Sequence, residues 1–279
     1  MEGFENIGVI AGGGQFPKLF IEAAKDSGRK SIVVGFKGET APEVVSAADC
    51  FCWVKLGQLG KVIQFFKKNN VAEAVFLGTI TKTRIFRDVF FDLKGLSLWR
   101  RIDRRHDDAI LRAIADALQD DGITIVESTR YLGDLLFPAG ILSKKKPNRQ
   151  QREDICFGWH MAKAIGKLDI GQCVVVRDRA VLAVEAIEGT DDAILRGGQL
   201  GKEKVVVVKV HKPGQDFRFD LPATGLQTIE SMKAANASVL AVEAGKSLMF
   251  DSEDFIREAD AAGIVVVGIT EDQEGQPRF

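Results

Sequence analysis

The sequence lacks the long apolar runs that membrane-spanning helices require. Uninterrupted apolar runs in its 279 residues are only a few residues long, whereas a helix needs roughly 20 to cross a hydrocarbon core. Residues 1–6 are acidic and lack the basic and apolar regions of a signal peptide. We therefore expect no transmembrane helix and a protein that stays in the cytosol.

Cysteine and histidine are scarce, which excludes several kinds of site. Four scattered cysteines are too few for a disulfide scaffold, so we expect reduced, mostly buried thiols. No two of the three histidines have the helical spacing of a zinc site. The Gly-x-Ser-x-Gly signature is also absent, which disfavours serine-hydrolase chemistry.

The chain has almost no net charge. Its 38 Lys and Arg residues nearly balance 39 Asp and Glu residues, giving a formal charge of −1. No field over the whole chain therefore draws it to nucleic acid or acidic lipid, and we expect no nucleic-acid partner. With 46% hydrophobic and 28% charged residues, the chain has a globular composition and the length for two domains.

Apolar strands alternate with helical stretches in the first half of the chain. We expect a parallel sheet covered on both faces, because these strands read as continuous apolar runs. Together they predict an α/β domain over residues 1–136. The expected strands are 7–11, 31–36, 50–55, 73–77 and 123–126, and the expected helices are 18–27, 59–69 and 108–121.

This rhythm breaks in a Gly/Pro-rich and basic stretch at residues 137–148, which we take as the domain boundary. A hairpin beyond it favours a mixed sheet. We predict a second α/β domain over residues 137–279 that carries a cluster of carboxylates. Its expected strands are 172–177, 180–187, 204–210, 239–243 and 264–269, and its expected helices are 150–166, 228–235 and 252–262.

A glycine loop at residues 12–17 joins the first strand to the first helix, where backbone N–H groups attract phosphate or sugar. As a dinucleotide fingerprint it is defective. Pro17 occupies the third glycine position, and Lys37 lies where an acid would bind ribose. We therefore predict no NAD site. Gly78 and Thr79 follow the fourth strand at the same sheet edge, although both loops are also compatible with purely structural turns.

Residues 84–105 interleave aromatic and aliphatic side chains with seven basic ones. Such a segment can lie at a membrane surface or hold acyl chains while its cations face phosphates. A dimer face or a helix packed on the second domain explains the pattern equally well.

Two segments of the second half concentrate reactive side chains. Residues 185–192 contain Glu188, Thr190 and Asp191, and residues 209–222 contain Lys212, Asp216, Arg218 and Asp220. Carboxylates from two segments can hold Mg²⁺, and the cations can offset phosphate charge. In the alternative reading, Thr190 caps a helix and the later residues form a salt-bridged extended strand with Asp216, Arg218 and Asp220 on one face.

Several motifs together resemble the LpxI family of UDP-2,3-diacylglucosamine pyrophosphatases of lipid A biosynthesis. The likeness covers essentially the whole chain, and the fourth motif carries most of its weight. The motifs are IAGGGQFP at 10–17, LDIGQ at 168–172, EGTD at 188–191, KPGQDFRFDLPATG at 212–225 and VEAG at 242–245.

The resemblance implies metal-dependent hydrolysis of UDP-2,3-diacylglucosamine to UMP and 2,3-diacylglucosamine 1-phosphate. It implies a Rossmann-like N-terminal domain, a C-terminal α/β domain, a homodimer, and peripheral work at the cytoplasmic face of the inner membrane. Asp216, Asp220 and Glu188 would be the catalytic and Mg²⁺-linked carboxylates. The residues implied to face the substrate are Gly13, Gly14, Gln15, Gly78, Thr79, Thr190, Asp191, Lys212 and Arg218.

Two other functions remain open from the residues alone. A nucleotide-sugar-binding or regulatory protein would keep the fold and bind without turnover. An NAD-linked oxidoreductase is weakened by Pro17 and Lys37.

Overall fold

The computed structural model describes residues 5–80, 90–99, 107–212, 216–219 and 221–279. Contacts divide the chain into two compact units. Unit 1 comprises Met1–Gly133 with Asp216–Asp220, and unit 2 comprises Asp134–Gln215 with Leu221–Phe279. Sequence reasoning placed Asp216 in the second domain, whereas the structure groups it with unit 1, where the neighbouring Phe219 packs against the core.

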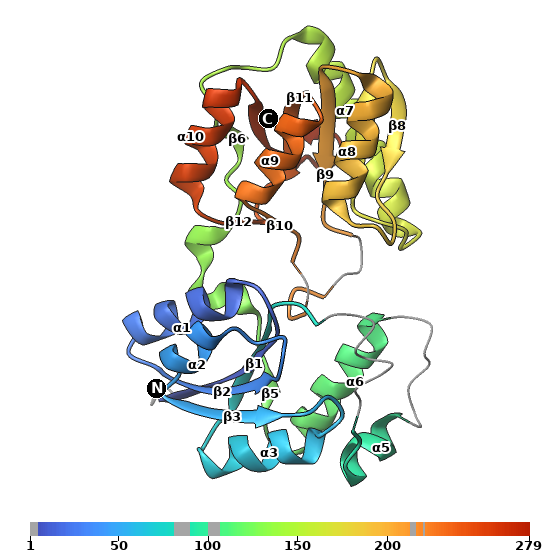
Figure 1. The fold of residues 1–279 in the computed structure, drawn as a ribbon. Coiled ribbons are helices and arrows are strands. Elements are labelled where there is room, and N and C mark those ends of the chain that lie inside the picture. The colour runs from blue at the N-terminus through green and yellow to red at the C-terminus, as the bar shows by residue number, and fades with distance from the viewer. Residues whose placement is uncertain (1–4, 81–89, 100–106, 213–215, 220) are drawn as a thin grey trace. The chain divides into compact units, whose positions relative to one another are not determined.

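Unit 1 is built on a parallel five-stranded sheet in the order β3-β2-β1-β4-β5 (Figure 1). Ile10 of β1 lies opposite Val34 on one side and Phe76 on the other. Since β2 and β4 flank β1, strand order reverses there, and open parallel sheets bind ligands at such points. The strands are β1 (Asn6–Ala11), β2 (Lys30–Phe36), β3 (Cys50–Val54), β4 (Glu73–Leu77) and β5 (Thr124–Ile125).

Helices cover both faces of this sheet. The helix after the glycine loop, α1, lies with α2 on one face, and α3 and α6 lie on the other (Figure 1). Pro17 lies in the first turn of α1, where its missing N–H costs no hydrogen bond. The helices are α1 (Phe16–Asp26), α2 (Pro42–Ala47), α3 (Leu59–Lys68), α5 (Leu93–Trp99) and α6 (Asp107–Asp120), followed by the 3₁₀ turns η1 (Ser128–Tyr131) and η2 (Gly133–Leu135).

Unit 2 contains a mixed sheet in the order β14-β13-β11-β9-β7-β8, with β6 paired to β13. Parallel pairing joins β9, β11 and β13, whereas β7 is antiparallel to both β8 and β9. The strands are β6 (Gly140–Ile141), β7 (Cys173–Arg177), β8 (Ala180–Val184), β9 (Val205–Lys209), β11 (Ala237–Glu243), β13 (Val265–Glu271) and β14 (Pro277–Arg278); β10 (Ala223–Thr224) and β12 (Leu248–Met249) form a separate pair.

Two hydrophobic cores lie on opposite faces of this sheet. In β9, Val205 and Val207 belong to one core, while Val206 and Val208 belong to the other. This alternation explains why the four residues before Lys209 are all valine, because side chains on both faces of the strand are buried. The covering helices are α7 (Arg149–Lys167) on one face and α8 (Thr190–Gly201), α9 (Leu226–Ala234) and α10 (Ser252–Ala262) on the other.

These sheets confirm the predicted fold class, a parallel-sheet α/β domain followed by an α/β domain with a mixed sheet. The prediction of mostly buried thiols is wrong. All four cysteines are free, but only Cys173 is buried, and Cys50 is exposed because β3 is an edge strand. Over the described residues, no helix combines the length and apolarity needed to cross a membrane.

Candidate active site

Backbone hydrogen bonds tie the glycine loop after β1 to the loop after β4. Gly12 N donates to Leu77 O (2.8 Å), and Gly13 N donates to Thr79 O (2.7 Å). Thr79 N donates back to Gly13 O (3.2 Å). The parallel sheet thus brings together two loops that sequence reasoning placed at one edge.

Close packing at this junction requires glycine at two positions. Gly78 has a φ of +79°, and a Cβ there would lie 2.2 Å from Gly13 O. A Cβ on Gly12 would lie 2.5 Å from Thr79 O. Both distances are far below van der Waals contact, so the junction admits no side chain at either residue. Close packing therefore explains why Gly12 and Gly78 are glycines, and the contact of Gly78 with a substrate stays a prediction.

The next two residues of the glycine loop are open to solvent. Gly14 has a φ of +86° and meets no atom at its Cβ position, and Gln15 is the exposed N-cap residue of α1. Unbonded N–H groups at a helix N-terminus attract anions. Gly14 and Gln15 are thus placed where a phosphate or sugar can approach.

An apolar cavity of about 380 Å³ lies inside unit 1 beside this junction. Gly12, Gly78 and Thr79 form part of its wall. Its size falls within the range of about 300–1,000 Å³ that is typical of small-molecule sites. Apolar side chains from the sheet, α3, α5 and α6 form most of the remaining wall, among them Val62, Phe76, Leu98, Trp99, Leu111 and Phe219.

The basic and aromatic segment 84–105 is described only between residues 90 and 99. Phe91 and Trp99 from this part line the cavity, while Leu93 is 89% exposed. Lys94 forms an ion pair with Asp121. Arg84, Arg87 and the arginines after Trp99 lie outside the described residues, so their predicted contact with phosphates stays a prediction.

The Asp216 segment of unit 1 is a turn, so the extended strand considered for it is wrong over residues 216–219. Phe219 N donates to Asp216 O (3.0 Å). Arg218 donates hydrogen bonds to both oxygens of the Asp216 carboxylate, from Nε to Oδ1 (3.0 Å) and from Nη2 to Oδ2 (2.7 Å). Asp220 lies outside the described residues, and its role stays a prediction.

The pKa of Asp216 lies below its usual value. The side-chain hydrogen bond from Arg218 is the main cause, and it outweighs the opposing effect of burial. The same pairing raises the pKa of Arg218. Asp216 is therefore ionised at neutral pH, the state in which a carboxylate can ligate a metal or accept a proton.

The other predicted acid, Glu188, belongs to unit 2. Its own backbone N–H and an ion pair with Arg196 lower its pKa. Thr190 is the first residue of α8 rather than its N-cap, which is Gly189 with a φ of +90°. The Thr190 hydroxyl instead donates to Glu185 Oε1 (2.9 Å), and Glu185 is buried. The alternative that Thr190 caps the helix is therefore wrong.

Two more predicted binding residues lie in unit 2. Asp191 is in the first turn of α8, and its Oδ1 atom is buried without a hydrogen-bond partner among the described residues. Lys212 Nζ pairs with Asp169 Oδ1 (2.7 Å), which lies in the LDIGQ turn. These two motifs of unit 2 are thus in direct contact.

The predicted metal ligands suit a divalent cation in chemistry, because they are carboxylates. Each described one already has a cationic partner, Arg218 for Asp216 and Arg196 for Glu188. Across the described ranges, no three His, Cys, Asp or Glu side chains are grouped to hold a metal ion. A metal at Asp216 would have to take oxygen atoms that Arg218 now holds.

Comparisons with known proteins match both halves of the chain. The LpxI N-terminal domain family matches residues 6–135, and the LpxI C-terminal domain family matches residues 138–267. The UDP-2,3-diacylglucosamine pyrophosphatase LpxI of Caulobacter vibrioides is 32% identical over 276 residues, covering 94% of this chain and 97% of that protein. The chain belongs to the LpxI family.

Two solved structures resemble this LpxI family member weakly. The biotin carboxylase domain of a thermophilic 2-oxoglutarate carboxylase is 11% identical, with a TM-score of 0.28 over 62% of this chain and 35% of that one. Phosphoribosylglycinamide synthetase from Anaerococcus prevotii is 14% identical, with a TM-score of 0.25 over 68% and 34%. Neither likeness bears on function.

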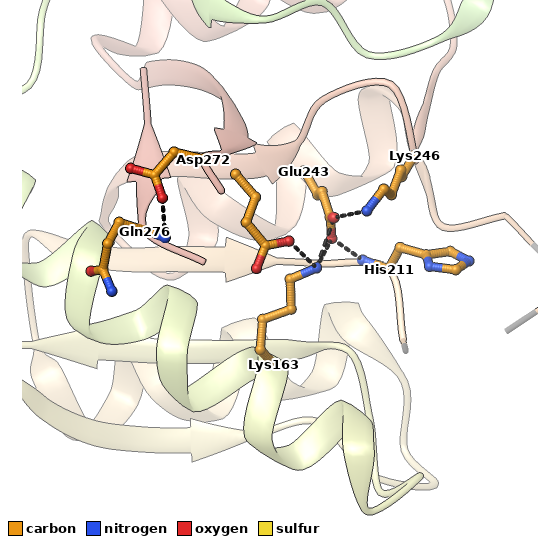
Figure 2. A network of polar contacts seen from close by, with 7 residues as sticks. Lys163, His211, Glu243, Lys246, Asp272 and Gln276 are labelled. Carbon is orange, nitrogen blue, oxygen red and sulfur yellow. Dashed lines mark hydrogen bonds and ion pairs between the residues drawn. The ribbon is translucent and has the colours of Figure 1, made fainter. Parts of the chain in front are cut away.

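A buried ion network in unit 2 of this LpxI family member escaped sequence reasoning (Figure 2). Glu243 ends β11 and is 2% exposed. Both its carboxylate oxygens accept from Lys163 Nζ at 2.7 Å, and Lys246 Nζ lies 3.0 Å from Oε1. His211 N donates to Oε2 (2.9 Å). Lys163 also lies 4.5 Å from the centroid of the Trp159 ring.

The pKa of Glu243 is the outcome of opposing effects. Burial alone would raise it, but hydrogen bonds and charge from Lys163 and Lys246 outweigh burial and leave it below the usual value. The available sequence signal was an acid ending an otherwise apolar strand, within the VEAG motif. That signal did not identify the partners, because Lys163 lies on a helix far away in sequence.

Proposed function

We propose that this chain hydrolyses the pyrophosphate bond of UDP-2,3-diacylglucosamine, giving UMP and 2,3-diacylglucosamine 1-phosphate. The similarity to the Caulobacter pyrophosphatase carries the proposal, because it extends over 94% of this chain and 97% of that protein. Family likeness restricted to one domain would support a shared fold only.

The cavity in unit 1 supports an acylated substrate. We propose that it takes an acyl chain of the diacylglucosamine, because burial of each methylene from water contributes about 0.8 kcal/mol. Gly13, Gly14, Gln15, Gly78 and Thr79 would then face the sugar and phosphates at the cavity's edge. In this arrangement one sheet edge serves both the apolar and the anionic parts of one molecule.

The proposed chemistry uses the carboxylates and cations of the predicted site. One carboxylate among Asp216, Asp220 and Glu188 takes a proton from water, whose oxygen bonds to one phosphorus. The P–O bond to the bridging oxygen breaks, and that oxygen leaves with the other phosphate. Lys212 and Arg218 offset the charge of the pyrophosphate.

Divalent metal dependence is part of this proposal. Asp216, Asp220 and Glu188 would hold an ion such as Mg²⁺, which when bound neutralises phosphate charge and lowers the pKa of bound water. At Asp216 this requires Arg218 to release the carboxylate, and the freed guanidinium then becomes available to the pyrophosphate.

UMP release from UDP-2,3-diacylglucosamine by the purified protein, with and without EDTA, tests both parts. We expect turnover that EDTA abolishes and added Mg²⁺ restores. Absent turnover would overturn the proposed function. Turnover that is indifferent to EDTA would overturn the metal alone.

Substitution of Asp216 tests its proposed role. Asp216→Ala should lower kcat by about 10²–10⁴-fold, the usual contribution of a general acid or base. The matched control is Asp254→Ala, because Asp254 pairs with Arg257 in a second aspartate–arginine pair, on α10. The control should keep the wild-type rate. Asp220→Ala should also lower kcat by orders of magnitude. Near-wild-type rates for both variants would remove these two residues from the site.

We also propose that the chain forms a homodimer and contacts the membrane surface peripherally at the cytoplasmic face. Exposed Phe90 and Leu93, 60% and 89% accessible, support contact with an apolar surface. Sedimentation analysis of the purified protein tests the first part, and co-sedimentation with anionic vesicles tests the second. A monomer, or a protein that stays in the supernatant, would contradict the respective part.

A further inference from the structure

The Asp216–Phe219 turn is unusual in belonging to unit 1. Both the chain before it, to Gln215, and the chain after it, from Leu221, belong to unit 2. Short connecting segments normally run over the surface of the unit to which their flanks belong. A short segment that is grouped with the other unit must be held there by contacts with that unit. Those contacts indicate the role of the segment.

Phe219 is the residue that anchors the turn in unit 1. Its ring centroid lies 5.6 Å from that of Phe76 on β4, with an edge-on angle of 70°. It packs against the core cluster of that unit and also forms part of the wall of the 380 Å³ cavity. Any apolar ligand that fills the cavity therefore touches Phe219 directly.

Phe219 is linked in turn to the predicted catalytic groups. The Arg218 guanidinium carbon lies 4.9 Å from the centroid of the Phe219 ring. Arg218 holds both oxygens of Asp216, and Phe219 N donates to Asp216 O. One continuous series of contacts thus runs from the cavity wall, through a cation on an aromatic face, to the ionised carboxylate.

Resting on the proposed function, we propose that Phe219 is a positioning and specificity-determining residue, which couples the presence of an acyl chain in the cavity to the placement of Asp216. A long chain packs on the Phe219 ring and fixes the turn, so the carboxylate reaches its working position. A substrate with short acyl groups leaves the cavity side of the ring uncovered, and the turn is then held only by its contacts within unit 1. Binding energy from a remote part of the substrate is then spent on orientation at the reacting centre.

A positioning role for Phe219 predicts a different kinetic effect from a role in lining the cavity alone. A wall residue changes KM, since it contributes equally to ground-state and transition-state binding. A positioning residue changes kcat, and a displacement of about 1 Å at the reacting groups can cost about 100-fold. The separation of kcat from KM is therefore the deciding readout.

The experiment measures UMP release by the full-length protein from two substrates, UDP-2,3-dimyristoylglucosamine and UDP-2,3-diacetylglucosamine. We expect wild type to prefer the dimyristoyl form in kcat. Phe219→Ala should lower kcat on that form by about 100-fold and change kcat on the diacetyl form by less than about threefold, since that form never engages the ring.

Two further variants protect the test. Phe51→Ala is the matched control, because Phe51 is also half-buried and packs edge-on against an aromatic neighbour, Trp53 at 4.8 Å; it should leave both rates and their ratio unchanged. Phe219→Leu keeps an apolar side chain in the wall, so it should retain the fold even if Phe219→Ala folds poorly. Its kcat on the dimyristoyl substrate should lie between that of Phe219→Ala and that of wild type.

The possible outcomes separate this inference from the proposed function. No UMP from either substrate with wild type overturns the proposed function and with it the inference. Turnover by wild type, with Phe219→Ala lowering both substrates equally or raising KM alone, overturns the inference and leaves the function standing. A fall in kcat confined to the dimyristoyl substrate supports both.

Discussion

Both units end parallel strands at one edge of a sheet, but they fill that edge with opposite kinds of group. In unit 1 the ends of β1 and β4 lead into backbone glycines and an apolar cavity. In unit 2 the ends of β9 and β11 carry Lys209 and Glu243, both buried and both hydrogen-bonded. An edge of glycine and apolar groups can accept a ligand without first breaking an ion pair, whereas buried charges must already be satisfied. The cavity proposed for an acyl chain is of the first kind, whereas the buried charges at the strand ends of unit 2 are held in place by their partners.

The largest expected effect comes from removing the charge at the centre of the unit 2 network. Glu243→Gln removes the nearest counter-ion of Lys163, which is only 16% exposed, and leaves it only Glu271 Oε2 at 3.9 Å among the described carboxylates, so the free energy of unfolding should fall by about 3 kcal/mol. Urea unfolding followed by circular dichroism measures this. The control, Glu230→Gln, removes an exposed partner of Lys233 and should cost less than about 0.5 kcal/mol. Equal costs for the two variants would contradict the difference between a buried and an exposed network.

The junction of unit 1 should respond to volume rather than to charge. Gly78→Ala places a methyl group 2.2 Å from Gly13 O at a positive φ, so we expect a loss of about 2 kcal/mol or more in unfolding free energy. Gly14→Ala shares the positive φ but meets open space, and it should cost about 1 kcal/mol. The same unfolding assay compares them. A Gly78→Ala variant as stable as Gly14→Ala would show that the two loops separate easily.

Acidification should lower the free energy of unfolding of unit 2 by protonating Glu243. The loss should be smaller than the loss caused by Glu243→Gln. Its folded pKa is lowered, so its contribution to stability is complete above the ordinary value of 4.5 and is lost as pH falls through the folded value. The stability difference between wild type and Glu243→Gln should therefore be constant above about pH 4.5 and shrink below it. Unfolding curves at a series of pH values measure it. A difference that grows on acidification would reverse the assigned direction of the pKa shift.

The smallest effect is expected at an ion pair of unit 1. Arg130 is 52% exposed and shares Glu73 with the less exposed Arg29, which lies 3.1 Å from the carboxylate. Arg130→Met should lower unfolding free energy by no more than about 0.5 kcal/mol, because Arg29 keeps the charge paired. Thermal melting would detect a larger loss, and such a loss would place a strong charge network in unit 1 as well.

Most of the fold followed from hydrophobic periodicity. The buried strands β1, β4 and β9 are apolar at nearly every position, and helices such as α10 repeat their apolar residues at helical spacing. Two-residue strands such as β10 and β12 were not predicted, because a single pair of hydrogen-bonded residues has no period to detect. Their pairing depends on residues 25 positions apart rather than on local pattern.

The candidate site was only partly within reach of the sequence. The parallel sheet predicted that the glycine loop and the loop at Gly78 would lie at the same edge, and Gly13 and Thr79 form a bridge there. The turn at Asp216 could not be predicted, since alternating Asp, Phe and Arg also suits an extended strand, and the contact of Phe219 with Phe76 joins residues far apart in sequence. Glu243 and Lys163 form a pair that no local pattern encodes, because 80 residues separate them.

The assignment of Asp216–Asp220 to unit 1 has a consequence for synthesis of the chain. As the chain leaves the ribosome, residues up to Gly133 emerge first, and all of Asp134–Gln215 must follow before Phe219 is available. Until then unit 1 lacks an aromatic ring of its core, and the wall of its cavity is open on that side. The first unit to be translated is therefore completed only after much of the second has been made, and maturation of the two units is linked in time as well as in space.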